Sequence, residues 1–339
     1  MRVLFFGNSR FSLPVLEALV DAGLCVAGVV TPITPRRGLS PWRRRLELGK
    51  RAVARTWARL PSPLGPGAGA GFNARLASLA ARAGAPLLSP GRVGDAEVID
   101  RLRRLRADVV LMAGFDQILG APLLAALGPV LNVHPSLLPS YRGPAPHFWM
   151  VKNGETEGGV SVHLVDDGID SGPLLAQERF AIEPWTTGGE LYERASRAGG
   201  ALATRVLREL RAGASGPATQ DGESSYFGPV ASEHLAVAFG EPLTAAYNRA
   251  RAAEPAHGSW VWVPHELARG EREVAGAALV ARPDVTTLRL HAPSAFPGAR
   301  IGPPGTVRRE GAGAVVQCVG GALLFGRASP VTPVSPASP

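Results

Sequence analysis

The sequence has little cysteine and no long apolar run. Its only cysteines, Cys25 and Cys318, lie far apart in apolar surroundings, which excludes a disulfide framework and a cysteine metal site. We therefore expect two structural thiols and no bound metal. No apolar stretch approaches the roughly 18 to 20 residues that a membrane span needs. The short apolar run in MRVLFFGNSRF is more typical of a strand and turn than of a signal peptide. These absences predict a cytoplasmic protein without a membrane anchor.

Charged residues are also scarce, at 19% of the 339 residues, and they are unevenly placed. The segment 34–60 has nine arginine and lysine residues against the single acid Glu47, an excess of eight that equals the formal net charge of the whole chain. A localised basic block favours a polyanionic partner such as nucleic acid. A solvated arginine face without a partner is the plain alternative.

Short apolar segments alternate with amphipathic ones along the first 210 residues. This alternation predicts an α/β fold with a doubly wound, mostly parallel sheet. A nicotinamide-binding fold is not favoured, because FFGNSRF after the first predicted strand lacks the GxGxxG spacing. The predicted strands are 2–7, 25–31, a short piece within 86–90, 107–114 and 129–134, and the predicted helices are 11–22, 72–83 and 95–105.

The remainder of the chain differs in texture. Residues 61–71 are rich in Pro and Gly and predict a flexible connection, and residues 211–241 are polar and rich in turn formers, which predicts a linker. A helix over 242–252 and five short strand-like segments between 258 and 328 predict a small OB-like β-barrel. We expect a catalytic domain over 1–210, the linker over 211–241, the barrel domain over 242–328 and a disordered tail over 329–339.

Three polar residues lie where chemistry is expected in such a sheet. Asn132 and His134 share one face at the carboxyl end of a predicted strand, and Asp170 follows the strand that begins near residue 160. A carboxylate beside an imidazole favours its protonated form during proton abstraction, and an amide can donate to an oxyanion. Without a nucleophilic Ser or Cys in the pattern, this set suits direct attack by an amine on an acyl group. A structural, hydrogen-bonded histidine is the alternative.

The motifs NVHPSLLPSYRGPAP (132–146) and VDDGIDSG (165–172) resemble the signature of the formyltetrahydrofolate-dependent formyltransferases. The segments FFGNSRFSLPVLEALVDAG and VLMAGFDQIL also resemble that family, so the resemblance covers residues 1–210. It implies a Rossmann-like catalytic domain that transfers a formyl group from 10-formyltetrahydrofolate, with Asn132, His134 and Asp170 as catalytic residues. Pro135 and Pro139 restrict the backbone after His134, so the loop needs little ordering on binding.

The same resemblance implies a folate site on three segments. Its residues are Phe115, Gln117, Ile118 and Leu119, then Ser136, Leu137, Leu138 and Pro139, and then Val165, Asp166, Asp167, Gly168 and Ile169. Asp166 and Asp167 also suit a plain turn, and the resemblance implies that their backbone contacts the pterin. For His163, which lies within a predicted strand, a structural role is favoured.

The acceptor is less defined. The region after residue 242 resembles the C-terminal domain of methionyl-tRNA formyltransferases and of some sugar-amine formyltransferases, and the basic segment 34–60 falls where the former contact tRNA. Arg43, Arg44 and Arg45 are therefore expected to bind an initiator tRNA, and His147 either contacts the acceptor or packs as a structural residue.

Alternatives to transfer onto tRNA remain open. The VAFG sequence before residue 241 and the nearly balanced charge of EREVAGAALVARPD depart from the family pattern. A formyltransferase for an amino sugar, an amino acid or a natural-product intermediate, a formyltetrahydrofolate hydrolase, and a catalytically silent folate- or nucleic-acid-binding protein all remain possible. The sequence leaves the oligomeric state open.

Overall fold

The computed structural model describes most of the chain outside the basic segment. The described residues are 1–32, 70–214, 216–236, 240–254, 259–264, 273–274, 285–301, 303–304, 306–310 and 312–330. They form two compact units. The predictions for the basic segment 34–60, for most of the connection 61–71 and for most of the tail 329–339 lie outside the described residues. Residues 70 and 71 begin helix α3, and residues 329 and 330 end strand β13, so both predictions are wrong at these positions.

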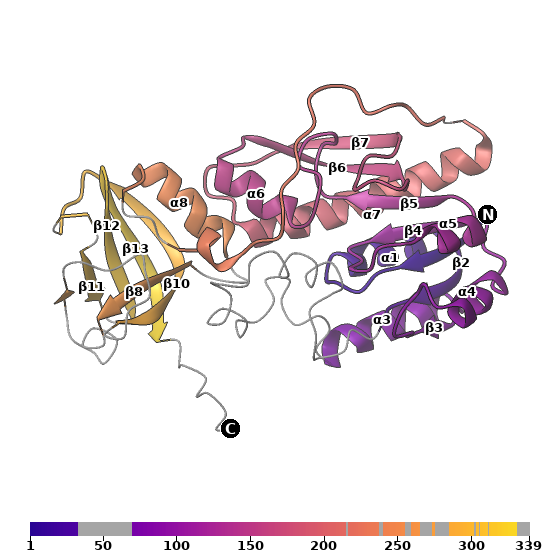
Figure 1. Cartoon of the computed structure of the whole chain (residues 1–339), viewed down its shortest axis with the longest axis horizontal. Coiled ribbons are helices and arrows are strands. Elements are labelled where there is room, and N and C mark those ends of the chain that lie inside the picture. Colours follow the sequence, from indigo (N-terminus) through magenta and orange to yellow (C-terminus); the bar gives the residue numbers. More distant parts are fainter. Residues whose placement is uncertain are drawn as a thin grey trace. The chain divides into compact units, whose positions relative to one another are not determined.

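The first unit, Met1–Pro146, Glu157–Phe180 and Tyr192–Gly228, is built on a seven-stranded sheet in the order β3-β2-β1-β4-β5-β6-β7 (Figure 1). Strands β3, β2, β1, β4 and β5 are parallel, whereas β6 runs antiparallel to β5. The predicted mostly parallel α/β fold is therefore confirmed. The strands are β1 (Arg2–Phe6), β2 (Cys25–Val30), β3 (Leu87–Leu88), β4 (Val109–Ala113), β5 (Val130–His134), β6 (Glu157–Leu164) and β7 (Leu174–Ala181).

Apolar side chains alternate across this sheet, so strands β1, β2, β4 and β5 each contribute to two cores. Val3 and Phe5 of β1 pack with helices α1 (Ser12–Asp21), α3 (Ala70–Arg82) and α7 (Gly188–Ala212). Leu4 and Phe6 pack with α4 (Ala96–Arg103) and α5 (Ala121–Leu127) on the other face. This two-layer burial explains why the strands of the sheet read as nearly continuous apolar runs.

The helices predicted over 11–22, 72–83 and 95–105 are confirmed within three residues as α1, α3 and α4. Helix α7 was not predicted from the sequence, because Gly199 and Gly200 interrupt its apolar pattern. A Cβ at Gly200 would lie 2.9 Å from the Ala18 Cβ and the Pro14 oxygen. Glycine at this position therefore lets α7 approach α1 closely.

The second unit contains His147–Thr156, Ala181–Leu191 and the described residues from Pro229 onward. Its six-stranded sheet has the order β8-β10-β13-β12-β11-β9, and every pairing recorded in it is antiparallel. Its elements are α6 (Pro146–Asn153), α8 (Leu243–Ala252), the 3-10 helix η1 (Ser232–His234), β8 (Ser259–Pro264), β9 (Glu273–Val274), β10 (Val285–Pro297), β11 (Val307–Glu310), β12 (Gly313–Cys318) and β13 (Gly321–Pro330).

The structure changes or leaves untested several expectations for the strands of the second unit and for the two cysteines. The apolar run 314–328 forms two strands, because Gly320 adopts φ 83° and turns the chain between β12 and β13. The strand-like segment 276–283 lies outside the described residues. Cys318 is buried as expected, but Cys25 is exposed at the start of β2, so the prediction of two apolar thiol environments is wrong for Cys25.

Among the described residues, no helix has both the length and the apolar character that crossing a membrane requires.

Candidate active site

Strands β5 and β6 place the polar residues of the site next to one another. Asn132 pairs with His163 across the antiparallel ladder, and His134 pairs with Ser161. Residues two apart on a strand share a face, so all four side chains lie on the same side of these strands. Asn132, His134 and His163 are 9%, 4% and 2% exposed, respectively. The carboxyl end of β5 is therefore a buried polar site within an apolar sheet.

Asp170 reaches this site from the loop that follows β6. Its Oδ2 lies 3.5 Å from His134 Nδ1, and its Oδ1 lies 3.3 Å from Asn132 Nδ2. The Gly143 N–H donates to Asp170 Oδ2 at 2.9 Å. The structure thus brings the three predicted catalytic residues together around one carboxylate.

The backbone at this site is locally strained. Asp170 adopts φ 51°, Tyr141 φ 60° and Ala145 φ 58°, a region that side-chain-bearing residues rarely occupy. Such conformations persist only when surrounding contacts hold them, and they concentrate at functional sites. Gly143 has φ 97°, and a Cβ there would lie 2.4 Å from the Phe227 oxygen, so only glycine fits between the two segments.

The hydrogen bonds of His134 define which nitrogen can accept a proton. Its Nε2 lies 2.9 Å from the Tyr141 carbonyl oxygen. Because a carbonyl only accepts, Nε2 carries hydrogen and Nδ1, which faces Asp170, is the basic position. Burial lowers the pKa of His134, and the Asp170 carboxylate opposes this only in part. His134 is therefore neutral at pH 7 and can take up a proton beside a carboxylate.

Asp170 stays ionised next to it. Burial alone would raise the pKa of Asp170, but the nearby imidazoles of His134 and His163 and the hydrogen bond from the Gly143 N–H together lower it well below its usual range. The same carboxylate affects Tyr226, whose phenol pKa is raised by burial and by the charge of Asp170. A fixed negative charge therefore lies against an imidazole that is poised to become positive.

His163 orients the amide of Asn132. The Nδ1 of His163 donates to the Leu164 carbonyl oxygen at 2.7 Å, so its Nε2 is an acceptor and lies 3.2 Å from Asn132 Nδ2. The amide nitrogen of Asn132 must therefore face His163 and Asp170, and it cannot flip. The sequence favoured a structural role for His163. In the structure, His163 directly contacts Asn132, a predicted catalytic residue.

The loop after β5 is held by buried hydroxyl and amide groups. Ser161 Oγ donates to the Ser136 carbonyl oxygen at 2.6 Å and accepts from the Leu138 N–H at 3.1 Å. Gln177 donates to the Leu138 oxygen and to Ser161 Oγ, both at 2.8 Å. Pro139 follows a cis peptide bond, and Ser136 Oγ donates to Ser140. Leu137 is half-buried in the same loop. This predicted folate segment is therefore held by several hydrogen bonds to its backbone.

The other two predicted folate segments share one apolar cluster. Phe115, Leu119 and Val165 all pack in the core beneath α4 and α5. Ile118 and Ile169, one on each segment, are 75% and 56% exposed. Gln117 accepts from the Val93 N–H and donates to the Gly91 oxygen, both at 3.0 Å.

Asp166 has a structural role within its loop. It accepts from the Gly168 N–H at 3.1 Å and from Ser171 Oγ at 2.9 Å. These local hydrogen bonds are typical of a turn-forming residue, which is one of the two roles that the sequence suggested for Asp166. Asp167 and Gly168 are exposed.

The structure does not test the predicted acceptor residues. His147 belongs to the second unit, and Arg43, Arg44 and Arg45 lie outside the described residues. No group of three or more His, Cys, Asp or Glu side chains suited to a metal occurs in the part of the chain that the structure describes.

Residues 216–228, which the sequence assigned to a linker, also reach the site. Ala218 bridges to Leu174, and Tyr226 bridges to Arg142. The rings of Tyr141 and Phe227 stack with centroids 4.8 Å apart. Gln220 donates to the Asp170 carbonyl oxygen at 2.9 Å. No periodic pattern marks these residues, so only the tertiary structure identifies them.

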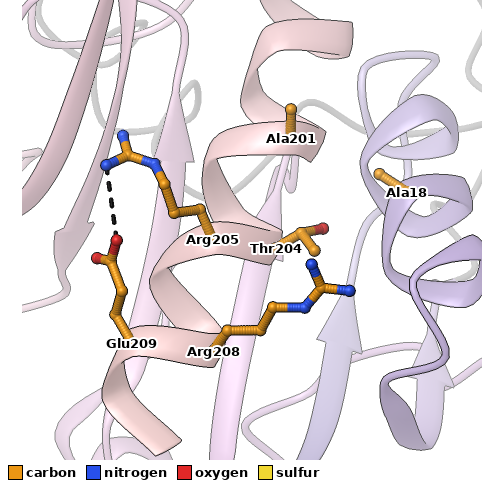
Figure 2. A pocket seen from close by; sticks show the side chains of 6 residues that line it. All are labelled: Ala18, Ala201, Thr204, Arg205, Arg208 and Glu209. Carbon is orange, nitrogen blue, oxygen red and sulfur yellow. Dashed lines mark ion pairs between the residues drawn. The ribbon is translucent and has the colours of Figure 1, made fainter. Parts of the chain in front are cut away.

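A separate hollow on the first unit is lined by Ala18 of α1 and by Ala201, Thr204, Arg205, Arg208 and Glu209 of α7 (Figure 2). Arg205 is paired with Glu209 at 3.7 Å, and Arg208 donates to the Ala22 oxygen. The hollow includes none of the residues around Asp170.

The arrangement around Asp170 defines a class of enzyme. An oriented amide, a neutral imidazole and an ionised carboxylate converge, while the nearby hydroxyls of Ser161 and Ser171 are bonded to the Ser136 oxygen and to Asp166. The site therefore suits acyl transfer by direct attack rather than through an acyl-enzyme.

Comparison with known proteins identifies the family. Residues 1–207 match the formyl transferase family, so the chain belongs to that family and is a formyltransferase. It is 34% identical to a methionyl-tRNA formyltransferase of Thermus thermophilus over 329 residues, which cover 96% of this chain and 90% of that protein. It is 33% identical to the methionyl-tRNA formyltransferase of Moorella thermoacetica, with 97% and 92% covered.

The fold is also similar to that of a solved sugar 3N-formyl transferase, WlaRD, with a TM-score of 0.59 over 98% of both chains. The two sequences are 16% identical, so this likeness concerns the fold alone.

Proposed function

We propose that the protein transfers the formyl group of 10-formyltetrahydrofolate to the amine of methionyl-tRNA. The observation that carries formyl transfer is the buried contact of Asn132, His134 and Asp170, with the proton-accepting Nδ1 of His134 facing an ionised carboxylate. The proposed acceptor is supported by the 34% identity to a methionyl-tRNA formyltransferase along 96% of the chain.

The residues of the first unit fit a folate donor. Phe115, Leu119 and Val165 pack in one cluster, and the exposed side chains of Ile118 and Ile169 offer apolar surface on both segments. Ser136 to Pro139 would form the third part of the folate site. When bound, the folate supplies an activated formyl group.

Four groups of this chain would carry out the transfer. The amine nitrogen bonds to the formyl carbon, and the bond from that carbon to the folate nitrogen breaks. His134 takes the proton of the attacking amine at Nδ1 and returns it to the departing nitrogen. Asp170 stabilises the imidazolium that forms. Asn132 donates to the formyl oxygen as negative charge develops there, and His163 keeps that amide oriented.

The segment 34–60 would bind the tRNA through phosphate contacts, since it holds nine basic residues and one acid. Replacing Arg43, Arg44 and Arg45 with alanine tests this. Loss of three phosphate contacts should flatten the slope of log affinity against log salt by about 2 to 3 and weaken binding. The measurement is charged-tRNA binding over a salt series, together with formyl transfer to methionyl-tRNA.

A matched control replaces three arginines of the first unit that lie in or next to α4, Arg101, Arg103 and Arg104, which are exposed. Their loss lowers the net charge equally, so it should leave the salt slope nearly unchanged. If both triple variants act alike, only general charge matters. If the wild-type protein formylates amino sugars or amino acids but not methionyl-tRNA, the acceptor is a small amine. Release of formate with no acceptor would identify a hydrolase.

Three further parts of the proposal concern the setting of the enzyme. The six-stranded antiparallel sheet would close as an OB-like barrel over 242–328, after a catalytic domain over 1–210 and a linker over 211–241 whose residues 216–228 pack with the catalytic domain. The enzyme would act in the cytoplasm without a resident metal, and His147 would contact the acceptor. Limited proteolysis followed by mass spectrometry would test the domain boundaries.

A further inference from the structure

The side-chain amide of Gln220 joins two loops around the carboxylate of the site. Its Nε2 donates to the Asp170 carbonyl oxygen at 2.9 Å and to the Gly172 carbonyl oxygen at 2.7 Å. Both carbonyls belong to the loop that carries Asp170, whose side chain contacts His134 and Asn132. Gln220 itself lies on the segment 216–228, more than 45 residues along the chain.

Arg142 determines which way this amide points. Its Nε and Nη2 both donate to Gln220 Oε1, at 3.3 and 2.7 Å. Because arginine only donates, the oxygen of the amide must face Arg142 and the nitrogen must face the Asp170 loop. The guanidinium therefore selects the one amide orientation that serves both carbonyls.

The backbone of Arg142 is held by the same segment that carries Gln220. The Arg142 N–H donates to the Ser225 oxygen at 2.9 Å, and the Phe227 N–H donates to the Arg142 oxygen at 3.0 Å. The Tyr141 N–H donates to Ser225 Oγ at 2.8 Å. Tyr141 supplies the carbonyl that fixes His134, and Gly143 supplies the N–H that binds Asp170. Residues 220–227 thus bond to Asp170 itself and to the backbone of Tyr141 and Arg142, the segment that contacts His134.

We propose that Gln220, oriented by Arg142, is a positioning residue that holds the Asp170 loop in its left-handed conformation and so keeps the carboxylate against His134. A backbone φ of 51° at a non-glycine residue needs such support from its surroundings. Loss of the two amide bonds would let the loop relax, and a displacement of about 1 Å at a catalytic group can lower turnover about 100-fold. The kinetic part of this inference rests on the proposed formyl transfer.

Two substitutions separate the donor from the rest of the side chain. Gln220→Glu keeps the acceptor oxygen for Arg142 but replaces the donating nitrogen with an oxygen that repels both carbonyls. Gln220→Leu removes both functions at similar volume. Each should lower kcat about 10- to 100-fold and change KM for donor and acceptor less than threefold. Thr219→Ala is the matched control, because Thr219 is exposed and contacts only Asp221 in the hydrogen bonds of this region. An unchanged kcat in Gln220→Glu would overturn the inference.

A double-mutant cycle tests the role given to Arg142. If Arg142 acts through Gln220, the pair Arg142→Ala and Gln220→Leu should lower kcat no further than Gln220→Leu alone. Multiplicative losses would mean that Arg142 acts independently, which contradicts the inference. Arg142→Lys is the milder variant if a member of the cycle does not fold, because it retains charge but loses the two-pronged contact with the amide.

The position of Asp170 can also be followed without any catalysis. NMR titration of the ¹⁵N-labelled imidazole of His134, assigned with His134→Asn, reports the carboxylate beside it, with His163 as the other titratable neighbour. The Asp170 carboxylate raises the pKa of His134, so Gln220→Leu should lower that pKa further. An unchanged titration would overturn the positioning role. If the wild type transfers no formyl group to any acceptor, the proposed function fails, while this titration still decides the role of Gln220.

Discussion

Two buried polar groups, one in each unit, bond in different ways. In the first, Asn132, His134, His163 and Asp170 contact one another. In the second, Gln317 of β12 is 3% exposed, and its side-chain amide bonds to backbone groups, namely the Ala299, Cys318 and Gly321 oxygens and the Ile301 N–H. A buried amide that serves backbone groups stabilises loops, whereas titratable side chains that contact one another can exchange protons.

The reason for this difference is energetic. Leaving a buried polar group unpaired costs about 1 to 3 kcal/mol, so a fold places one only where it is satisfied. The side chain of Gln317 forms hydrogen bonds with nearby backbone groups. Asp170 and His134 bring a charge and a proton-accepting nitrogen into a poorly solvated place, where electrostatic effects are stronger than in water. If this comparison is right, substitutions in the two units should separate activity from stability.

The largest effect is expected from His134→Asn. Without the His134 imidazole, the assigned proton acceptor of the attacking amine is lost, so kcat should fall about 10²- to 10⁴-fold. Steady-state formyl transfer with saturating donor is the measurement. His234→Asn is the control, because the Nδ1 of His234 accepts the Ala231 N–H in the second unit. Similar losses of kcat in both variants would contradict the assignment of proton transfer to His134 in the first unit.

Gln317→Leu should lower stability and leave activity nearly unchanged. It removes the amide from three carbonyls and one N–H, and we expect it to lower the free energy of unfolding by about 1 to 3 kcal/mol. The kcat of formyl transfer well below the unfolding temperature should stay within about twofold. Urea denaturation and kinetics on the same preparation test both statements. A tenfold loss of kcat without a stability change would contradict them.

A smaller effect is expected on the pH profile. Because burial lowers the pKa of His134 below its ordinary value of 6.5 and its neutral form is the base, the contribution of His134 to kcat/KM should be complete above that value, where any further rise with pH reflects deprotonation of the acceptor amine. It should fall as the pH drops through the lowered pKa, up to tenfold per pH unit.

The free energy of unfolding should also depend on the protonation of His134. The unfolded chain binds a proton at His134 at higher pH than the folded chain does, so acidification below 6.5 favours unfolding. His134→Asn should remove this contribution, which urea titrations at several pH values can show. Asp170 stays ionised across this range because its pKa is lowered. A kcat/KM that rises on acidification would contradict the assignment of His134 as base.

The smallest effect is expected at the surface. Arg179 and Glu157 form an ion pair of 2.6 Å between β7 and β6, with side chains 64% and 55% exposed. Solvent screening leaves such pairs worth about 0.2 to 1 kcal/mol. Arg179→Ala should change unfolding by no more than this and leave formyl transfer unaltered, as chemical denaturation and a kinetic assay would show. A larger loss of activity would mean that the β6–β7 edge takes part in the site.

Much of the first unit could be predicted from the sequence, because periodicity reports directly on burial. Alternating apolar and amphipathic segments predicted β1, β2, β4 and β5 with α1, α3 and α4. Residues 314–328 were harder, since a turn at Gly320 leaves the apolar run almost continuous. The exposure of Cys25 was missed for a related reason, because an apolar neighbourhood in sequence does not define the end of a strand that is open to solvent.

The sequence by itself determined the α/β pattern and the presence of an amide and an imidazole two residues apart at a strand end, because both follow from local spacing. The tertiary structure alone decided that His163 holds the Asn132 amide, that Gly143 supplies an N–H to Asp170, and that Gln220 supports the Asp170 loop. These contacts join residues far apart in the chain through single hydrogen bonds. Hydrogen bonds of that kind leave no periodic trace in the sequence, so they emerge only when the strands and loops are packed.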